Sequence, residues 1–459
     1  MHYRLISHNP NNRHLIFIFL GWAMDPVPFE ESGLKKSGFD IVVGYHYESI
    51  EDARSVFEKL IANYQEVSVI AWSYGVAIAD RIADNPNVVC RIAINGTPTP
   101  VNNETGIPER YQNLTLRMLS DVNLAKFYQS TGLVDVPLPH RLLDDLKDEL
   151  KLFSNIDNNL SNTAWKKAYI SECDAIFPPK NQINAWNGKT RVEMIKDGRH
   201  YVPFDKIIEN DIIDKQLVAK RFSENVEFYE SHASIQRAIA VRLNELWSAL
   251  QDISGQKVLE LGIGTGFLTR GYITNNINNQ SVAVDLIETT TLADVHDKKG
   301  FKYPGKLVCD DAEHYLDSLE DNSFDAIVSA STIQWFNDLP RFFKNIERVL
   351  KHGGVAAIAT FAEGTFAELK EASERSLIYP TSDYLKSIVP EGLTIVDLIT
   401  DEFKIEFANS RQLLSHIKET GVNAVGSPTL PGQTRRILSY FEANPHLTYR
   451  PLYLTIIKQ

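Results

Sequence analysis

Cysteine is scarce in this chain: Cys90, Cys173 and Cys309 are the only three among 459 residues. They lie far apart, so their spacing offers neither a disulfide framework nor the paired cysteines of a zinc site. We therefore expect no bound metal. The scarcity also fits a reducing compartment, which predicts a cytoplasmic protein.

Long apolar runs are also missing. The run LIFIFL, residues 15–20, is ended at once by Gly21, and the residues before it contain no apolar segment of signal-peptide length. A membrane-spanning helix needs about 20 consecutive apolar residues. The sequence therefore predicts neither a secretory signal nor a membrane partner.

The chain lacks an excess of positive charge, because 47 Lys and Arg residues stand against 59 Asp and Glu, a net charge of -12. This balance argues against a nucleic-acid partner. There is no internal repeat and no linker rich in proline, glycine and serine. The length exceeds what one core usually serves, so we expect two domains, residues 1–212 and 213–459, joined by a short helical connection.

A serine follows the third of three buried strands expected in the first half. The apolar residues 67–71 predict this strand, and Trp72-Ser73-Tyr74-Gly75 then leads into a helix over 76–83. A strand, a tight turn with serine and a helix form the context of a nucleophile elbow. Ala71 stands where the usual pattern has its first glycine, and a small residue can still pack there. A serine in such a place is also a common helix N-cap.

An acid and a histidine follow later strands in the order that a serine hydrolase needs. Asp174 comes after a strand predicted over 167–172, and His200 after one over 190–195. This order of Ser, Asp and His is typical of α/β-hydrolases. Ser73 would attack an acyl carbon, His200 would move its proton, and Asp174 would orient the imidazole. The amides of Tyr74 and Trp22 are the expected oxyanion donors.

Five stretches of the first half resemble the BioG-type pimeloyl-acyl-carrier-protein methyl ester esterases. They are GWAMDP, AWSYG, INGTPTP, ECDAIFPPKNQ and GRHYVPF. The resemblance implies an α/β-hydrolase domain whose cap occupies about residues 100–165, where helices are expected over 114–128 and 139–152. Four apolar residues there are either an acyl tunnel or plain core. They are Leu116, Leu119, Phe127 and Tyr128.

The second half is organised around a glycine-rich turn. Residues 258–261 predict a buried strand, and Gly262, Gly264 and Gly266 follow it, with Glu260 leading the motif. A dinucleotide fingerprint would have its third glycine at position 267, where Phe267 stands. The spacing resembles the first motif of class I S-adenosylmethionine methyltransferases, a Rossmann-like doubly wound α/β fold. S-adenosylmethionine is therefore the expected cofactor.

Acids after the next two strands support a nucleotide site. Asp285 ends a strand over 281–286, about 20 residues after the glycines, where a carboxylate can bind both ribose hydroxyls. Asp311 follows the next strand, where these enzymes recognise the adenine amino group. Either acid standing alone could be a solvated loop residue.

Further stretches resemble the BioC-type malonyl-acyl-carrier-protein O-methyltransferases. They are RFSENVEFYESHASIQ, IQWF, VLKHGG, TFAEGTFAELK, HIKETGVNAVG and the pair Arg435-Arg436. Tyr229, in the stretch that resembles this family's substrate lid, and Trp335 are expected to contact the substrate. Tyr229 could equally be an aromatic that packs an amphipathic helix.

Together the two resemblances imply a bifunctional enzyme of biotin biosynthesis with acyl carrier protein as partner. One half would methylate the free carboxyl of malonyl-carrier protein, and the other would hydrolyse the methyl ester of pimeloyl-carrier protein. A hydrolase-like lyase fused to a quinone-type methyltransferase, or a half that only binds, stay open as alternatives. Basic residues are candidates for docking the acidic carrier, although each could be ordinary surface charge. They are Arg110, Arg117, Lys126, Arg221, Arg435 and Arg436.

Overall fold

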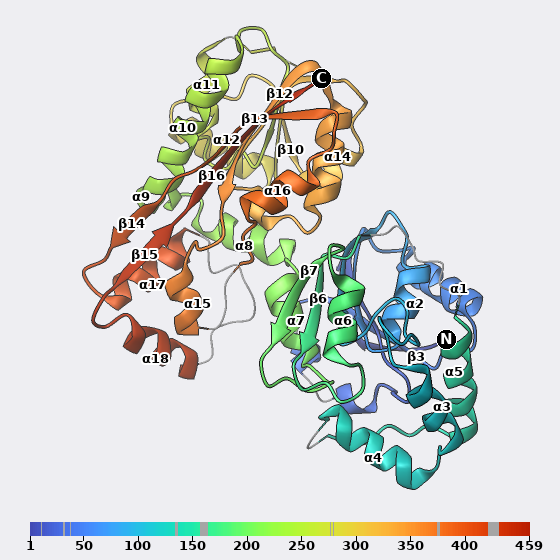
Figure 1. Cartoon of the computed structure of the whole chain (residues 1–459). Helices are drawn as coiled ribbons and strands as arrows, with labels where there is room; N and C mark the ends of the chain where they lie inside the picture. Colours follow the sequence, from blue (N-terminus) through green and yellow to red (C-terminus); the bar gives the residue numbers. More distant parts are fainter. Residues whose placement is uncertain are drawn as a thin grey trace. The chain divides into compact units, whose positions relative to one another are not determined.

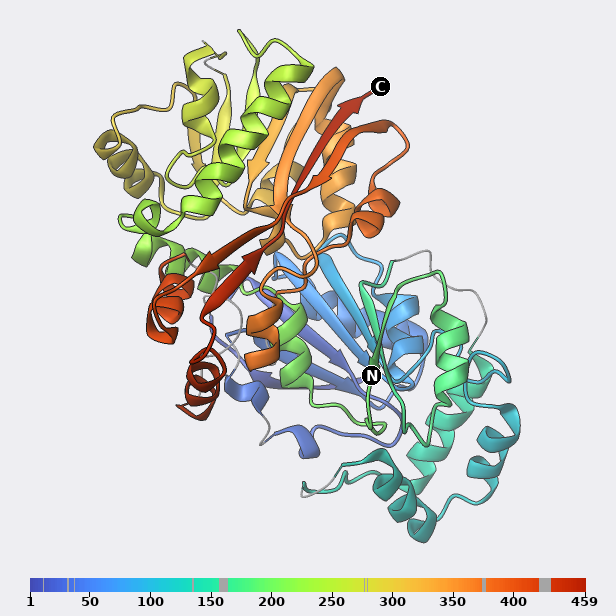
Figure 2. The same cartoon turned by 60° about the vertical axis from the view of Figure 1, so that its left-hand side comes forward.

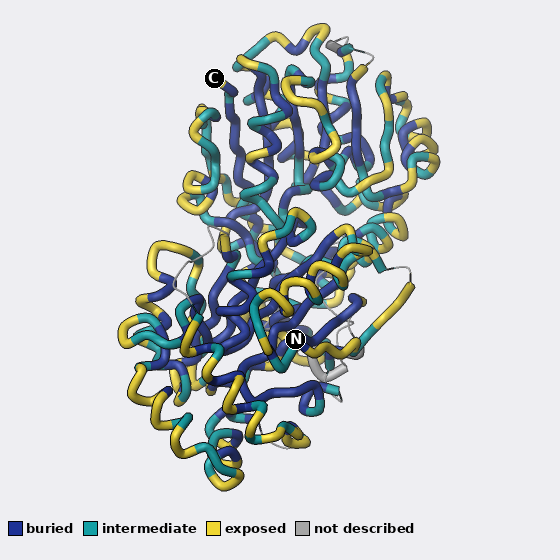
Figure 3. Tube along the Cα trace, turned by 90° about the vertical axis from the view of Figure 1, so that its right-hand side faces the viewer, coloured by how far each residue is buried: buried dark blue, intermediate teal, exposed yellow. Residues whose placement is uncertain are grey.

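The computed structural model divides into two compact units, Met1–Ile208 and Glu209–Gln459. It describes residues 1–10, 12–30, 33–36, 38–133, 136–156, 164–275, 277–278, 280–373, 377–420 and 431–459. Within these ranges no helix has the length and apolar character needed to cross a membrane. The central strands of each sheet are deeply buried (Figure 3).

The first unit is built on a seven-stranded sheet in the order β1-β3-β2-β4-β5-β6-β7. β1 pairs antiparallel with β3, and the other strands run parallel. The strands are His2–Ser7, His14–Phe19, Asp40–Tyr45, Glu66–Trp72, Val88–Ile94, Lys167–Ser171 and Arg191–Ile195. β4 and β5 are buried along their whole length, as near-continuous apolar runs in a parallel sheet predict.

Helices connect these parallel strands. In α1, Ile50–Ile61, Ser49 caps the first turn by accepting a hydrogen bond from the amide of Asp52, and Phe57 packs inward. The remaining helices outside the cap are η1 Val27–Phe29, η2 Gly33–Lys36, α2 Gly75–Ile82, α6 Pro179–Trp186 and α7 Phe204–Asp211.

Three helices lie between β5 and β6, in the region expected to form a cap (Figure 2). They are α3 Glu109–Arg117, α4 Asp121–Thr131 and α5 Leu143–Asn155. The continuous helix expected over 114–128 is wrong. α3 ends at Arg117, and the Ser120 side chain caps a new helix by accepting a hydrogen bond from the amide of Asn123. The apolar spacing continues across this break and so does not reveal it.

The connection expected near residue 212 contains two helices. α7 ends at Asp211, and α8, Lys215–Asn225, begins after Asp214, whose side chain accepts from the amide of Leu217. Two more helices, α9 Tyr229–His232 and α10 Ser234–Leu250, precede the glycine-rich turn.

The second unit has its own seven-stranded sheet, in the order β10-β9-β8-β11-β12-β16-β13. The first five of these strands run parallel, and β16 pairs antiparallel with β12 and β13. The strands are β8 Val258–Leu261, β9 Val282–Asp285, β10 Lys306–Cys309, β11 Phe324–Ala330, β12 Leu350–Phe361, β13 Leu393–Thr400 and β16 Pro451–Lys458. This is the Rossmann-like α/β arrangement that the glycine motif predicted.

Helices cover both faces of this second sheet. α10 and α12 lie on one side and α14 and α16 on the other (Figure 1), each over its own apolar cluster. Trp247 of α10 belongs to one cluster and Phe343 of α14 to the other. The helices are α11 Thr269–Tyr272, η3 Ile273–Asn275, α12 Thr289–Lys298, α13 Ala312–Asp317, η4 Ile333–Trp335, α14 Leu339–Val349 and α16 Ser382–Ile388.

A small outlying layer completes the second unit. The two-stranded ladder of β14, Phe403–Glu406, and β15, His446–Tyr449, lies beside α15 Ala367–Ser373, α17 Ser410–Glu419 and α18 Pro431–Tyr440 (Figure 1). Residues 421–426, part of the HIKETGVNAVG stretch, lie outside the described residues.

Candidate active sites

Ser73 occupies a strained turn between β4 and α2. Its φ of 60° is left-handed, a conformation that costs a residue other than glycine of order 1–3 kcal/mol. The turn is tight, and it leaves no room for a side chain at Gly75, where a Cβ would lie 2.4 Å from the carbonyl oxygen of Phe19. The fully buried Ala71 takes the place of the usual first glycine without displacing the strand. The strand, tight turn and helix expected around Ser73 are therefore present.

The structure brings Ser73, His200 and Asp174 together across more than 120 residues of sequence. His200 Nε2 lies 2.9 Å from Ser73 Oγ, and His200 Nδ1 lies 3.0 Å from each carboxylate oxygen of Asp174. All three residues are at least nine-tenths buried. This is a continuous hydrogen-bonded chain from carboxylate to imidazole to hydroxyl.

Further side chains and backbone groups hold this chain in place. Asp174 Oδ1 accepts from the amides of Ile176 and Phe177, and Gln182 Nε2 donates to Asp174 Oδ2 over 3.0 Å. Trp72 Nε1 and Asn95 Nδ2 each donate to the His200 carbonyl over 2.8 Å. None of these supporting residues was predicted from the sequence. Gln182, Trp72 and Asn95 stand inside the stretches that carry the BioG resemblance, but no spacing rule marks them.

The turn that carries Trp22 packs directly against Ser73. A Cβ on the neighbouring Gly21 would lie 2.6 Å from Ser73 Cβ, so the turn reaches the hydroxyl only because residue 21 is glycine. The cap holds the other side of this turn. Trp22 Nε1 donates to the Leu146 carbonyl of α5, and Tyr128 of α4 donates to the Ala23 carbonyl. Trp22 follows Gly21 in this turn and Tyr74 follows Ser73 in the chain, and the role of their amides as oxyanion donors stays a prediction.

The residues expected in an acyl tunnel divide between core and cap surface. Tyr128 is buried and hydrogen-bonded, whereas Phe127 is partly buried with its ring 4.9 Å from that of Trp22. Leu116 and Leu119 are partly buried. A tunnel stays a prediction.

Three of the candidate docking residues are exposed on the cap helices, and they are Arg110, Arg117 and Lys126.

The glycine turn of the second unit lies at the carboxyl end of β8. Gly262 has a φ of 76°, and a Cβ there would lie 2.0 Å from Thr332 Oγ1, so only glycine allows this approach to the β11 loop. A Cβ added to Gly264 would have no atom within 4 Å, and this residue lines the cavity. Gly266 was expected to contact the cofactor. It is not a lining residue, and its missing side chain instead makes room for the Phe301 ring.

His296, which was not predicted as a site residue, also contacts this glycine turn. Its Nε2 lies 2.9 Å from the Gly264 carbonyl, and burial lowers the pKa of its imidazole. The neutral ring can therefore donate to that carbonyl at neutral pH.

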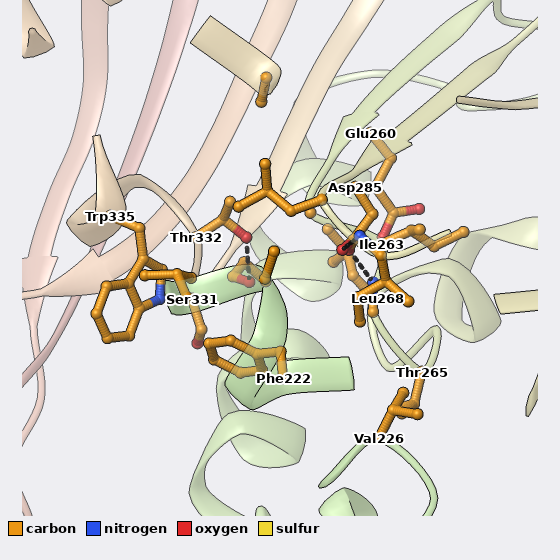
Figure 4. Close-up of a pocket in the computed structure, with 18 of the residues that line it drawn as sticks. Phe222, Val226, Glu260, Ile263, Thr265, Leu268, Asp285, Ser331, Thr332 and Trp335 are labelled. Atoms are coloured by element: carbon orange, nitrogen blue, oxygen red, sulfur yellow. Dashed lines mark hydrogen bonds between the residues drawn. The ribbon is translucent and has the colours of Figure 1, made fainter. Parts of the chain in front are cut away.

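Asp285 and Glu260 face the turn from neighbouring strands. Asp285 Oδ2 accepts from the amide of Gly264 over 2.8 Å, so the carboxylate fixes the loop as well as lining the cavity (Figure 4). Burial raises its pKa, against the backbone hydrogen bonds that lower it. Glu260 accepts from Tyr272 and Thr269, and burial raises its pKa to about 7.

Asp311 also lines the cavity, and its carboxylate has partners within the chain. Oδ1 caps α13 by accepting from the amide of Glu313, and Lys215 of α8 donates to Oδ2 and to Glu313. Lys215 itself lines the cavity, with its ammonium 5.6 Å from the Phe336 ring centre. No sequence motif marked this lysine. Recognition of adenine by Asp311 stays a prediction.

The cavity bounded by these residues has a volume of about 120 Å³. Phe222 of α8 and Val226, which follows this helix, line the cavity, and so do Ser331 and Trp335 from the segment after β11 (Figure 4). Tyr229, which was expected to contact substrate, lines this cavity too.

Arg221, a candidate docking residue, is not an exposed surface charge. Its side chain is partly buried, and burial lowers the pKa of its guanidinium group.

The lining fits S-adenosylmethionine. The open space at Gly264 admits a ligand against the backbone, carboxylates at Asp285 and Asp311 suit hydroxyl and amino donors, and Glu260 suits a cation. Most of the other lining residues are aromatic or aliphatic.

The raised pKa of Glu260 predicts pH-dependent cofactor binding. Below pH 7 the free carboxyl is mostly protonated, whereas a bound cation favours its ionised form, so binding releases a proton. Affinity for S-adenosylmethionine should rise by up to about tenfold per pH unit up to about pH 7 and then level off. Calorimetry in buffers of different ionisation enthalpy measures both effects.

The Glu260→Gln variant should lose this dependence, and the exposed-site control Glu245→Gln should keep it. A pH-independent wild-type affinity, or an unchanged pH profile in Glu260→Gln, contradicts the assignment.

Two family models match the chain. Residues 1–209 match the family described as pimeloyl-ACP methyl esterase BioG, and residues 259–358 match a methyltransferase domain. The cofactor is accordingly S-adenosylmethionine, the methyl donor. A solved structure of BioG from Haemophilus influenzae is 26% identical, with a TM-score of 0.39, over 44% of this chain and 94% of that chain.

Curated relatives extend this similarity. A malonyl-[acyl-carrier protein] O-methyltransferase of Bacteroides fragilis is 28% identical over 98% of this chain and 94% of its own length. The enzyme of the same description from Haemophilus influenzae is 30% identical over 52% of this chain and 94% of its own length. The chain therefore belongs to the malonyl-[acyl-carrier protein] O-methyltransferase family, and it carries a BioG domain in its first 209 residues.

Proposed function

We propose that this chain makes and removes the same protecting group. The second unit methylates the free carboxyl of malonyl-acyl carrier protein, and the first hydrolyses the methyl ester of pimeloyl-acyl carrier protein, both in biotin biosynthesis. The observation that carries the proposal is the hydrogen-bonded chain of Ser73, His200 and Asp174 in the same polypeptide as the glycine-turn cavity.

The first unit is proposed to be an α/β-hydrolase. Its antiparallel first strand, followed by parallel strands with the serine turn after β4, supports this fold. Ser73 attacks the ester carbonyl as His200 takes its proton, and His200 then gives this proton to the departing methanol, which leaves the acyl group on Ser73. A water molecule, deprotonated by His200, then hydrolyses this acyl-serine, and the proton returns to Ser73 as the free carboxyl is released. Asp174 holds Nδ1 of the imidazole protonated so that Nε2 faces the serine. The amides of Trp22 and Tyr74 stabilise the oxyanion.

Methyl transfer in the second unit needs no side chain that takes or gives a proton. S-adenosylmethionine, when bound, supplies an electrophilic methyl group on positively charged sulfur. The acceptor carboxyl, with an ordinary pKa near 4, is already ionised at neutral pH, so no general base is required. Walls such as Trp335 and Phe336 keep the site dry, which favours a transition state in which opposite charges disappear.

The partner of both units is acyl carrier protein, an acidic protein. Arg435 and Arg436 are exposed on α18, and Arg110, Arg117 and Lys126 are exposed on the cap, so basic docking groups exist on each unit. Screening limits their reach to about 8 Å at physiological salt. Local contacts rather than net charge would therefore guide docking.

Replacing Ser73 with alanine should separate the two activities. Hydrolysis of pimeloyl-carrier methyl ester should fall by at least about 10⁴-fold, because the nucleophile is lost, while methyl transfer to malonyl-carrier protein is unchanged. Mass spectrometry of the carrier measures both rates. The control Ser55→Ala, at an exposed position of α1, should keep both. Hydrolysis that survives in Ser73→Ala would show that the nucleophile lies elsewhere.

The esterase must spare the malonyl ester that its neighbouring unit produces. Pimeloyl has four more methylenes than malonyl, and at about 0.8 kcal/mol each their burial provides roughly 3 kcal/mol, or about 200-fold. We expect the cap to provide this burial, so pimeloyl-carrier methyl ester should be hydrolysed about 200-fold faster at limiting substrate. Comparable rates for the two esters would refute chain-length selection.

A further inference from the structure

A second, smaller cavity adjoins the cofactor cavity. Its volume is about 20 Å³, and five residues line both spaces, so the two meet along one wall. The shared residues are Phe222, Tyr229, Gln236, Ser331 and Trp335. We call this second cavity the aromatic chamber, because most of its lining residues are tyrosine, phenylalanine or tryptophan.

Two hydrogen-bond donors in the shared wall have no partner among the described residues. They are Trp335 Nε1 and Ser331 Oγ. Trp335 is only 6% exposed, and a buried donor without a partner costs roughly 1–3 kcal/mol. Both side chains lie on the Phe222 side of the cavity (Figure 4), and the Phe222 ring is 5.9 Å from that of Trp335. Unpaired donors that line a cavity suit a ligand with an acceptor group.

The backbone places Ser331 at a strained position. It follows β11 directly with a φ of 58°, and its amide donates to the Ala359 carbonyl over 2.8 Å. Gln334 Nε2 donates to the Ser331 carbonyl over 2.7 Å, and Gln334 accepts from Thr360. Strain of this kind persists where the surroundings fix it, and it gathers at functional sites. The hydroxyl is therefore held against the chamber.

The chamber walls carry no ionised side chain among the described residues that line it. Burial raises the pKa of Tyr379 and of Tyr449, so both remain neutral phenols at neutral pH. His416 lies behind this wall, with Nε2 2.6 Å from the Tyr449 hydroxyl, and burial lowers its pKa to about 4. The groups that meet a ligand here are neutral.

Neutral donors suit a carboxylate that must react. A lysine or arginine beside it would stabilise the charged ground state more than a transition state in which the charge is lost. An N–H and an O–H can orient the oxygens at a smaller cost. The volume of the chamber also suits a carboxylate. About 20 Å³ holds a group the size of one or two water molecules and is too small for a benzene ring, which occupies a cavity of about 150 Å³.

We propose that the aromatic chamber is the acceptor subsite, in which Trp335 Nε1 and Ser331 Oγ bind the terminal carboxylate of a short, unbranched acyl chain. This inference rests on the proposed methyl transfer. The carboxylate oxygen forms its bond to the methyl carbon as the carbon–sulfur bond breaks and that electron pair returns to sulfur. No proton moves, so the two donors act by positioning.

The test compares Ser331→Ala and Trp335→Phe with matched controls in the full-length chain. Ser323→Ala removes a partly buried hydroxyl that donates to the Glu320 carbonyl outside the cavity lining, and Trp247→Phe removes an unpartnered indole N–H from the core, also outside that lining. Each chamber variant should lower kcat/KM for malonyl-carrier protein by about 10-fold to 100-fold, the range expected for a hydrogen bond to a charged group. The S-adenosylmethionine Kd should stay within about threefold, and esterase activity should be unchanged.

Binding gives a readout that does not depend on turnover. Malonyl-pantetheine should bind the wild-type chain preloaded with S-adenosylhomocysteine, and both chamber variants should weaken this binding by a similar factor. Chamber variants that retain wild-type kinetics and binding overturn the subsite, as does an equal loss of S-adenosylmethionine affinity. A wild-type chain that does not methylate malonyl-carrier protein instead overturns the proposed function, whatever the variants do.

Discussion

Both sites depend on one constraint of parallel sheets, which is that the carboxyl ends of neighbouring strands lie along the same edge. Loops after β4, β6 and β7 therefore bring Ser73, Asp174 and His200 into one hydrogen-bonded chain. In the second unit, loops after β8, β9 and β11 likewise surround one cavity. Side chains that act together can thus be far apart in sequence while the sheet keeps them within a few ångströms.

The sequence predicted the parts of each site that depend on this constraint. A serine, an acid and a histidine that follow successive buried strands must gather at one edge, and so must Gly262, Asp285 and Asp311. The strand runs were recognisable because a parallel sheet buries both faces and leaves near-continuous apolar segments. The order of the strands that precede Ser73, Asp174, His200, Gly262, Asp285 and Asp311 could therefore be inferred from the sequence.

The supporting contacts could not be predicted in this way, because no local period or spacing encodes them. Lys215 reaches Asp311 across almost 100 residues, and Gln182 reaches Asp174 from a separate helix. The break between α3 and α4 was missed for a related reason. Apolar spacing continues through Ser120, and a single side-chain cap decides that a new helix begins there.

The two proposed reactions have opposite chemical requirements. Ester hydrolysis builds negative charge and needs amide donors and an oriented imidazole, whereas carboxylate methylation removes charge and is favoured by neutral, water-poor walls. The buried chain at Ser73 and the uncharged aromatic chamber match these two requirements. One polypeptide would then attach a methyl ester and later remove it.

The most direct test of this account incubates the wild-type chain with S-adenosylmethionine and malonyl-acyl carrier protein, and separately with pimeloyl-acyl carrier protein methyl ester, and follows the carrier by mass spectrometry. The account predicts one methyl gained in the first reaction and one methyl lost in the second. A malonyl-carrier protein that stays unmethylated, or a pimeloyl ester that stays intact, would contradict it.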